Sequence, residues 1–400
     1  MLYARTATVL LPGRTGRAAA SVLSGLMFAL HPVHTEAVAG VVGRAEVLSA
    51  VFFFAALLSY HRHVKLRGRR ECGESGRDRG RGSSDPNGNV VLSKKVGSGK
   101  ATVAAHRETA FLGLTVALAA LAMFSKEQGV TVLGVCFLND LLRPTSRLMS
   151  GGEKRRSLVT LAVSVAALLA LRARVMGFSP PHFARADNPA SAEDSATARA
   201  LTFLFLPAFN LWLLLCPSRL SFDWSMDAVP VVRSLADGRN LATLAFYSAL
   251  GAAFVKRVWP LLPGVVASCQ QGNPVASRSN RLAAACLALM ALPFLPASNL
   301  FFYVGFVVAE RVLYVPSAGF CLLSGCGAAM ALSWARGRGP AARSVVPALL
   351  LCALVGGGLR TVRRNRDWAD EEGLYRSGIQ INPPKGKRLR GDNKKGGREG

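Results

Sequence analysis

The chain has 400 residues, half of them hydrophobic, and its 49 Lys and Arg outnumber its 23 Asp and Glu, giving a net charge of +26. A soluble protein of this apolar content would need a very large core, and a soluble nucleic-acid-binding protein would interleave its basic residues with amphipathic elements. Here long apolar runs carry almost no charge and basic residues cluster between them, which is typical of membrane-spanning helices joined by charged loops. The composition predicts an all-α polytopic integral membrane protein that binds no nucleic acid.

The apolar runs predict the spans. A hydrocarbon core of about 30 Å requires roughly 20 apolar residues per helix, or fewer where the bilayer thins. This predicts about nine spans, at 18–33, 37–60, 109–124, 129–142, 157–176, 242–262, 282–297, 317–334 and 344–360. Two further runs are predicted as re-entrant or interfacial segments, because 201–216 is interrupted by Pro207 and 300–309 is followed by a charged pair.

The basic residues predict the orientation of these spans. Cytosolic loops of membrane proteins retain Lys and Arg, and the spans above place every internal Arg-rich loop on one side. A span at 201–216 would invert everything after it, which argues against one. The predicted organisation is a basic N-terminal segment (1–17), a helical hairpin (18–60), a disordered basic cytosolic loop (61–108), transmembrane helices (109–176), a luminal loop (177–241), transmembrane helices (242–360) and a luminal stub with a low-complexity tail (361–400).

Ionisable side chains at membrane depth are candidate functional groups, because burying each costs about 2.5 kcal/mol or more. The first cluster lies at the predicted turn between two spans, where His31, His34 and Glu36 fall within six residues. If a helix continues from there, Glu36 and Arg44 share one face across the small Gly40 and could bracket a polar group. A capped hairpin without a ligand fits equally well. A metal site made of the two imidazoles and the carboxylate is disfavoured, because no second cluster supplies further ligands.

Two more clusters pair a cation with a carboxylate. Lys126 and Glu127 lie between two short apolar runs and could bind an anionic headgroup or each other. Glu310 and Arg311 precede Tyr314, and the planar guanidinium of Arg311 could clamp a phosphate.

The fourth cluster lies in the predicted luminal loop, where Asp223 stands among aromatic and acidic residues in the run SFDWSMD. This pattern suits sugar or peptide contact, and it equally suits an interfacial belt. All four clusters fall on the same, non-cytosolic side of the predicted topology, which favours a site there.

Four stretches occur in an order that resembles a known family. They are LHPVHTEAVAGVVGRAEVLSAVFFF, MFSKEQGVTVLGVCFLND, DNPAS followed by RALTFLFLPAFNLWLLLCPSRLSFDWSMDAVP, and AERVLYVPSAGFCLL. Together they resemble the transmembrane and tetratricopeptide-repeat containing (TMTC) family, from roughly residue 18 to Lys385. The stretch from Asp187 to about Pro230 is similar to the family's domain of unknown function.

The resemblance implies a GT-C-like glycosyltransferase of the endoplasmic reticulum membrane. Such an enzyme would transfer mannose from dolichyl-phosphate-mannose to Ser or Thr of luminal proteins, with no other cofactor and no metal. The lipid phosphate would need cations, for which Lys126, Arg311 and Arg44 are candidates. His31, His34, Glu36, Glu127, Asp223, Glu310 and Tyr314 complete the predicted donor- or substrate-binding set.

The sequence also departs from the family pattern. The resemblance implies an acidic catalytic pair in a first luminal loop, but no Asp precedes Asp78, so no catalytic residue is assigned. The repeats expected after residue 385 are replaced by a basic tail. We therefore expect a chain truncated at both ends, and one that is inactive as it stands. The alternative is a non-catalytic scaffold or lipid-binding protein; a transporter is disfavoured, because the charged clusters lie at one face and no inverted repeat is found.

Overall fold

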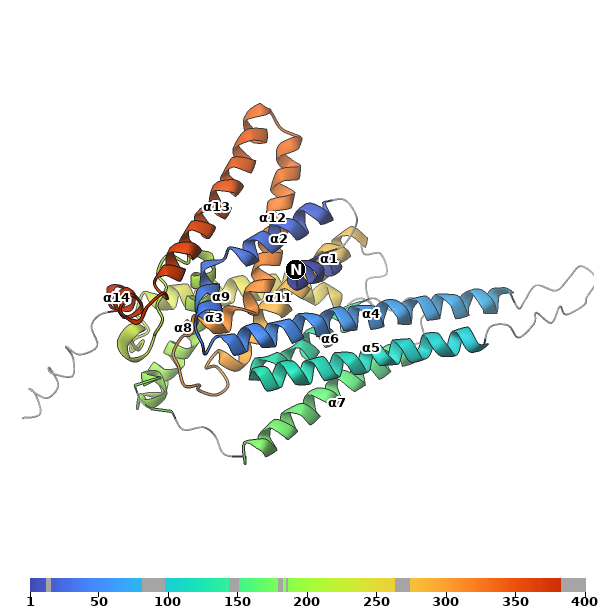
Figure 1. The fold of residues 1–400 in the computed structure, drawn as a ribbon, viewed down its shortest axis with the longest axis horizontal. Helices are drawn as coiled ribbons and strands as arrows, with labels where there is room; N and C mark the ends of the chain where they lie inside the picture. The colour runs from blue at the N-terminus through green and yellow to red at the C-terminus, as the bar shows by residue number, and fades with distance from the viewer. Residues whose placement is uncertain are drawn as a thin grey trace, which may run out of the picture. The chain divides into compact units, whose positions relative to one another are not determined.

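The structure, a computed structural model, describes residues 1–11, 16–80, 98–143, 151–178, 183–184, 186–262 and 274–382. The regular elements within these ranges are helices, which confirms the all-α class (Figure 1). In the described residues, eight helices are long and apolar enough to cross a membrane, and the chain is a polytopic membrane protein. They are α4 (Arg44–Gly80), α5 (Ser98–Ser125), α7 (Gly151–Val175), α8 (Ala196–Leu215), α9 (Arg239–Ala253, continued by irregular turns to Leu261), α11 (Pro274–Phe294), α12 (Pro316–Arg336) and α13 (Pro340–Arg366).

Three helices differ from the predictions: two are shorter than the predicted spans, and one is longer than the predicted re-entrant segment. α2 (Arg17–Ala29) has 13 residues and α6 (Thr131–Leu141) has 11, whereas spans were predicted over 18–33 and 129–142. At 1.5 Å per residue both are shorter than a hydrocarbon core. α8 differs in the other direction: the run predicted as re-entrant at 201–216 belongs to one helix of 20 residues, and Pro207 lies inside it without ending it.

The predicted disordered loop at 61–108 is wrong over much of its length. α4 continues to Gly80 and α5 begins at Ser98, while residues 81–97 lie outside the described part. The polar side chains that suggested a solvated loop are paired inside the protein instead. His63 Nδ1 lies 3.0 Å from the carbonyl oxygen of Glu108, and Arg67 forms an ion pair of 2.7 Å with Asp140.

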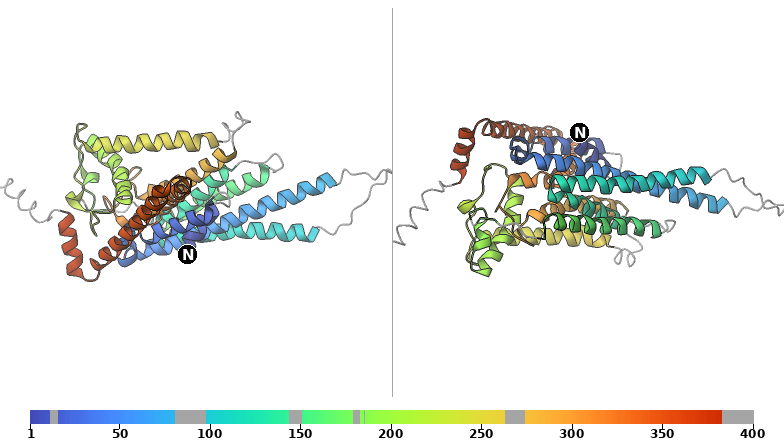
Figure 2. Two further views of the ribbon diagram at one scale, coloured as in Figure 1. Left: turned by 90° about the horizontal axis from the view of Figure 1, so that it is seen from above. Right: turned by 60° about the horizontal axis from the view of Figure 1, so that its bottom comes forward.

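The chain folds as two compact units. Unit 1 comprises Met1–Pro12, Ser49–Phe178 and Arg257–Ala285, and unit 2 comprises Gly13–Leu48, Ser179–Lys256 and Cys286–Gly400. In unit 1, α4 and α5 run side by side (Figure 2), and α6 packs on α7. The short helix α1 (Leu2–Leu10) also belongs to this unit, and the ring of Tyr3 packs at a tilt against Phe54, with 5.6 Å between ring centroids.

Unit 2 is built around close helix contacts. α2 packs along α12, and the absence of a side chain at Gly325 lets the backbone of Ser24 approach it. α12 and α13 form an antiparallel pair (Figure 1). The shorter elements of this unit are η1 (Pro32–His34), α3 (Thr35–Ala39), η3 (Pro189–Ala192), η4 (Met226–Ala228), η7 (Leu295–Ala297), η8 (Glu310–Leu313) and α14 (Glu371–Ile381).

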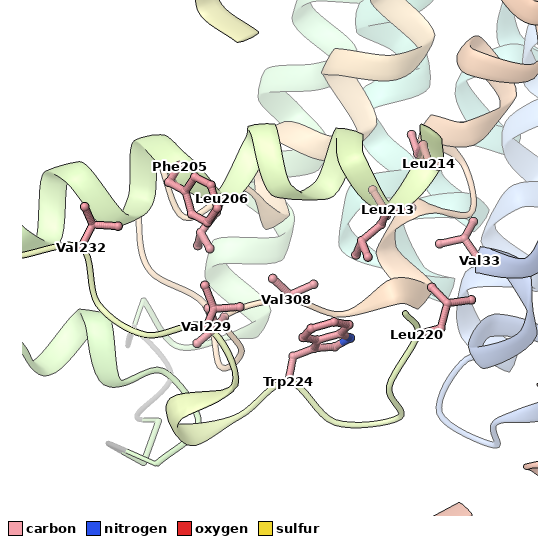
Figure 3. Close-up of a cluster of buried hydrophobic side chains, with 12 residues drawn as sticks. Val33, Phe205, Leu206, Leu213, Leu214, Leu220, Trp224, Val229, Val232 and Val308 are labelled. Atoms are coloured by element: carbon pink, nitrogen blue, oxygen red, sulfur yellow. The ribbon is translucent and has the colours of Figure 1, made fainter. Parts of the chain in front are cut away.

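The core of unit 2 joins α8 to the chain that follows it. Phe205, Leu206 and Leu213 of α8 pack with Leu220 and Trp224 in a buried hydrophobic cluster (Figure 3). At roughly 25 cal/mol per Å² of apolar surface, each fully buried side chain contributes about 1.5 to 3 kcal/mol to folding. This cluster fixes residues 216–232, a stretch with little regular structure, against η8, where two of the predicted site residues lie.

Candidate functional site

The turn after α2 places Glu36 beside Arg311. Glu36 lies in the first turn of α3, where the helix dipole favours a carboxylate. Its Oε2 atom accepts a hydrogen bond from the backbone amide of Arg311 (2.9 Å), and its Oε1 atom accepts one from Arg311 Nη1. The carboxylate is nearly buried while the guanidinium is about a quarter exposed. Glu36 therefore orients a cation that still reaches the surface of unit 2.

Arg44 does not share a helix face with Glu36, so that prediction is wrong. α3 ends at Ala39, and Gly40 has an extended backbone (φ −72°, ψ 136°), so α4 starts separately at Arg44. Gly40 instead allows a close approach, since a Cβ atom there would lie 3.1 Å from the ring of Trp368. Gly40 was predicted to separate Glu36 from Arg44 on one helix face. It instead leaves space for the ring of Trp368, which follows the end of α13.

Glu310 is completely buried beside this pair. Its Oε1 atom accepts hydrogen bonds from the amide of Ser221 (2.6 Å) and from Trp224 Nε1 (3.1 Å). Burial, followed by the charge of Glu36, raises the pKa of Glu310 to about 8, against the opposing effect of Arg364. The side chain is thus a neutral carboxylic acid at pH 7. The two adjacent side chains therefore lie in different environments: Glu310 points into the protein, and Arg311 points toward its surface.

Several buried hydrogen-bond donors near Glu310 lack acceptors. Arg364, which is 1% exposed, donates from Nη1 to Asp367 (3.0 Å) and to Ser377 (3.2 Å). Within the described part of the chain, no acceptor contacts Arg364 Nε or Nη2, Arg311 Nε or Trp368 Nε1. Buried donors without acceptors are uncommon and costly, so they are places where an anionic ligand can be accommodated.

The imidazole rings of His31 and His34 are both hydrogen-bonded to other groups of the protein. His31 Nε2 donates to the carbonyl oxygen of Leu214 (3.1 Å), while Nδ1 accepts from the amide of Val33 (3.3 Å). His34 Nε2 is hydrogen-bonded to Ser317 Oγ (2.7 Å). Burial lowers the pKa of His31 to about 4 and that of His34 well below its usual value, so both rings are neutral. In the described ranges no three His, Cys, Asp or Glu side chains are grouped as metal ligands.

The remaining predicted residues divide between the units. Tyr314 packs against His34 (4.7 Å between ring centroids), so it belongs with the site in unit 2. Asp223 is also in unit 2, but its carboxylate accepts bonds from the amide and hydroxyl of Ser225 and so shapes its own turn. Lys126 and Glu127 lie in unit 1, where Glu127 pairs with Arg172.

Sequence reasoning missed Arg364, Trp368 and Asn382, and it included Ser221 only as the first residue of the run SFDWSMD. Arg364 lies in a run of basic residues. Such a run was used only to predict on which side of the membrane a segment lies. Asn382 Nδ2 donates to Ser221 Oγ (3.0 Å) and to the carbonyl oxygen of Asp223 (2.6 Å), which holds the loop after α8 against the end of α14. Its only sequence signal is an Asn before two prolines.

An apolar pocket of about 290 Å³ lies in the same unit. Its walls come from α8, α9, α11 and the start of α12, and Leu313 of η8 is part of them. The lining is almost entirely aliphatic and aromatic, with Asn210 and Tyr247 as its polar members. Because Leu313 follows Arg311 by two residues, the short element η8 carries both the partly exposed Arg311 guanidinium and one wall residue of the pocket. This combination suits a ligand with an anionic head and an apolar tail.

Known proteins resemble the chain along most of its length. A family model described as "Protein O-mannosyl-transferase TMTC, DUF1736" matches residues 177–251. The protein O-mannosyl-transferase TMTC2 of Mus musculus is 38% identical over 414 residues, covering 91% of this chain and 45% of the relative. TMTC4 of Homo sapiens is 36% identical, with coverages of 91% and 45%, and Tmtc1 of Drosophila melanogaster is 37% identical, with coverages of 96% and 46%. The chain thus spans less than half the length of these relatives. No solved structure matches it significantly.

Proposed function

Because the chain belongs to the TMTC family, we propose that it is the membrane part of a protein O-mannosyl-transferase and binds the lipid-linked sugar donor. The donor in this proposal is dolichyl-phosphate-mannose, and the acceptors are Ser or Thr hydroxyls of luminal proteins in the endoplasmic reticulum. The membrane domain would be of the GT-C kind. The predicted luminal loop at 177–241 contributes residues 216–232, which pack on the donor site.

The observation that carries this proposal is the Arg311 cation held by Glu36 beside unsatisfied donors. In the transfer, the bond between the sugar's anomeric carbon and the phosphate oxygen breaks, and the acceptor oxygen takes its place. The lipid phosphate leaves with an additional negative charge, which a preorganised guanidinium stabilises most strongly in the transition state. Arg311, supported by Arg364 and Trp368, would supply that stabilisation. The proton of the acceptor hydroxyl must pass to a base, and we assign that role to no residue of this chain.

The apolar pocket supports a lipid rather than a soluble donor. Its aliphatic and aromatic lining can accept a hydrocarbon chain while leaving few polar groups without partners. The isoprenoid chain would occupy the pocket beyond Leu313 while its phosphate meets Arg311. The non-catalytic alternative, a lipid-binding scaffold, would use the same two features without transfer.

The test is binding of a photoreactive polyprenyl phosphate to the chain in microsomes. Replacing Arg311 alone would leave the buried Glu36 carboxylate unpaired, so the variant combines Glu36→Gln with Arg311→Gln. We expect photolabelling affinity to fall roughly tenfold or more, because a charge-assisted contact is removed. The control Arg363→Gln removes an exposed arginine near the end of α13 and should leave labelling unchanged. Equal labelling of all three proteins would refute the donor site.

Transfer is tested separately with the protein in microsomes, dolichyl-phosphate-mannose and a luminal acceptor peptide. Mannosylated peptide supports the enzyme. Labelling without transfer by the folded protein would support the lipid-binding scaffold instead.

A further inference from the structure

We propose that unit 1 carries a separate binding site for a phosphate group, in a basic pocket formed by α1, α4, α6, α7 and α11. The pocket has a volume of about 380 Å³. Five cationic side chains line it, namely Arg67, Arg143, Lys154, Arg278 and Arg281. This site uses none of the residues assigned to the donor.

The charges around the pocket are poorly balanced. Among its described lining residues there is no Asp or Glu. Arg67 is paired with the carboxylate of Asp140, which is fully buried and accepts two bonds from Arg67 (2.7 and 3.0 Å) and one from Tyr60 (2.9 Å). Asp140 neutralises the charge of Arg67, whereas Arg143 and Arg278 form no side-chain ion pair in the described part of the chain. Arg281 is close enough to Arg143 and Arg278 for their like charges to repel it.

The helix ends add to this imbalance. Lys154 lies in the first turn of α7, where the dipole acts, whereas Arg278 and Arg281 lie about one and two turns into α11, where its effect is weaker. The N-terminal end of a helix carries a partial positive charge, so cations are unfavourable there and anions are favourable. Lys154 is partly compensated, since its Nζ atom donates to the carbonyl oxygens of Leu141 (3.2 Å) and Arg143 (2.6 Å) at the end of α6. A bound anion would reduce the repulsion among the remaining positive charges of the pocket.

The shape and lining indicate a phosphate attached to a hydrocarbon. Aliphatic side chains form much of the remaining wall, including Val9, Leu10, Leu142 and Leu282. The five cations all come from segments that the charge rule predicts on the cytosolic side. Basic pockets between transmembrane helices on that side bind anionic headgroups, because about 1 kcal/mol is gained per basic residue near the surface, a factor of about five in affinity. The ligand class is therefore a phosphate, either that of an anionic phospholipid or that of a soluble phosphate.

The experiment is native mass spectrometry of the purified chain with phosphatidic acid, with phosphatidylcholine and with inorganic phosphate. The pocket variant combines Arg143→Gln with Arg278→Gln, and neither arginine has a side-chain ion pair in the described structure. The matched control combines Arg155→Gln with Arg156→Gln, which removes the same charge from exposed positions on α7. We expect the affinity for phosphatidic acid to fall roughly 25-fold in the pocket variant, a factor of about five for each arginine, and less than twofold in the control.

Competition with inorganic phosphate shows whether the bound phosphate belongs to a lipid or to a soluble molecule. Displacement of phosphatidic acid by millimolar inorganic phosphate supports a soluble ligand, and retention of the lipid under the same conditions supports a phospholipid headgroup. Equal losses in both variants, or equal binding of phosphatidylcholine, would overturn the proposal, because binding would then follow overall charge or hydrophobicity. If the double variant does not fold, the single Arg278→Gln variant at an exposed position replaces it, with Arg155→Gln as its control.

Discussion

Replacing Glu310 by Gln should remove a pH dependence from the stability of the protein. Burial raises the pKa of Glu310 from 4.5 to about 8, so the folded state keeps a proton that the unfolded state has released. The free energy of unfolding therefore falls as pH rises through this window, by about 1.4 kcal/mol per pH unit. Between pH 6 and pH 8 the loss is about 2 to 3 kcal/mol, and it levels off above the folded pKa.

The Gln variant keeps the contacts and removes the titration. Its amide oxygen can accept the bonds from Ser221 and Trp224, as Glu310 Oε1 does. We expect the variant to match the wild type near pH 7 and to exceed it by about 1 kcal/mol or more at pH 9. Glu310→Ala is different, because two buried donors lose their acceptor, at about 1 to 3 kcal/mol each.

The measurement is thermal unfolding in detergent from pH 6 to pH 9, followed by tryptophan fluorescence. The quantity of interest is the wild-type stability minus that of Glu310→Gln at each pH, which cancels the titration of all other groups. A difference that stays constant, or that moves in favour of the wild type with rising pH, would refute the neutral buried acid.

Two further substitutions test packing in each unit. Asp140→Asn leaves Arg67 buried without its counter-charge and should lower the free energy of unfolding by about 3 to 5 kcal/mol, measured by chemical denaturation; an effect below 1 kcal/mol would contradict the buried ion pair. Gly325→Ala places a Cβ atom 2.6 Å from the backbone nitrogen of Ser24, so α2 and α12 must separate, and we expect a loss of about 1 to 3 kcal/mol. Gly327→Ala, where nothing lies within 4 Å, is its control and should be neutral or stabilising.

The helices were largely predictable because hydropathy identifies a span without knowledge of its neighbours. The prediction was wrong where polar side chains find partners elsewhere in the chain. His63 and Arg67 look like loop residues in isolation, yet both are buried in α4 because Glu108 and Asp140 meet them. Such pairings join residues tens of positions apart, and no local pattern reports them.

The candidate site was predicted as separate pieces. Glu36 and Arg311 were each selected because ionisable groups at membrane depth are costly, but they are 275 residues apart and nothing in the sequence pairs them. The helix periodicity that linked Glu36 to Arg44 failed at Gly40, whose extended backbone ends α3. Arg364 was hidden in a basic run, where a buried guanidinium has the same sequence signature as an exposed one.

The basic pocket of unit 1 also constrains how the chain is threaded through the membrane. Arg143 and Lys154, near the junction of α6 and α7, line the same pocket as Arg278 and Arg281 near the start of α11. Two positions on one side of a bilayer must be connected by an even number of crossings. If α7 and α9 each cross, they supply two, and a third crossing by α8 would make the number odd. The shared pocket therefore predicts that α8, although it has the length of a span, stays at one face of the bilayer.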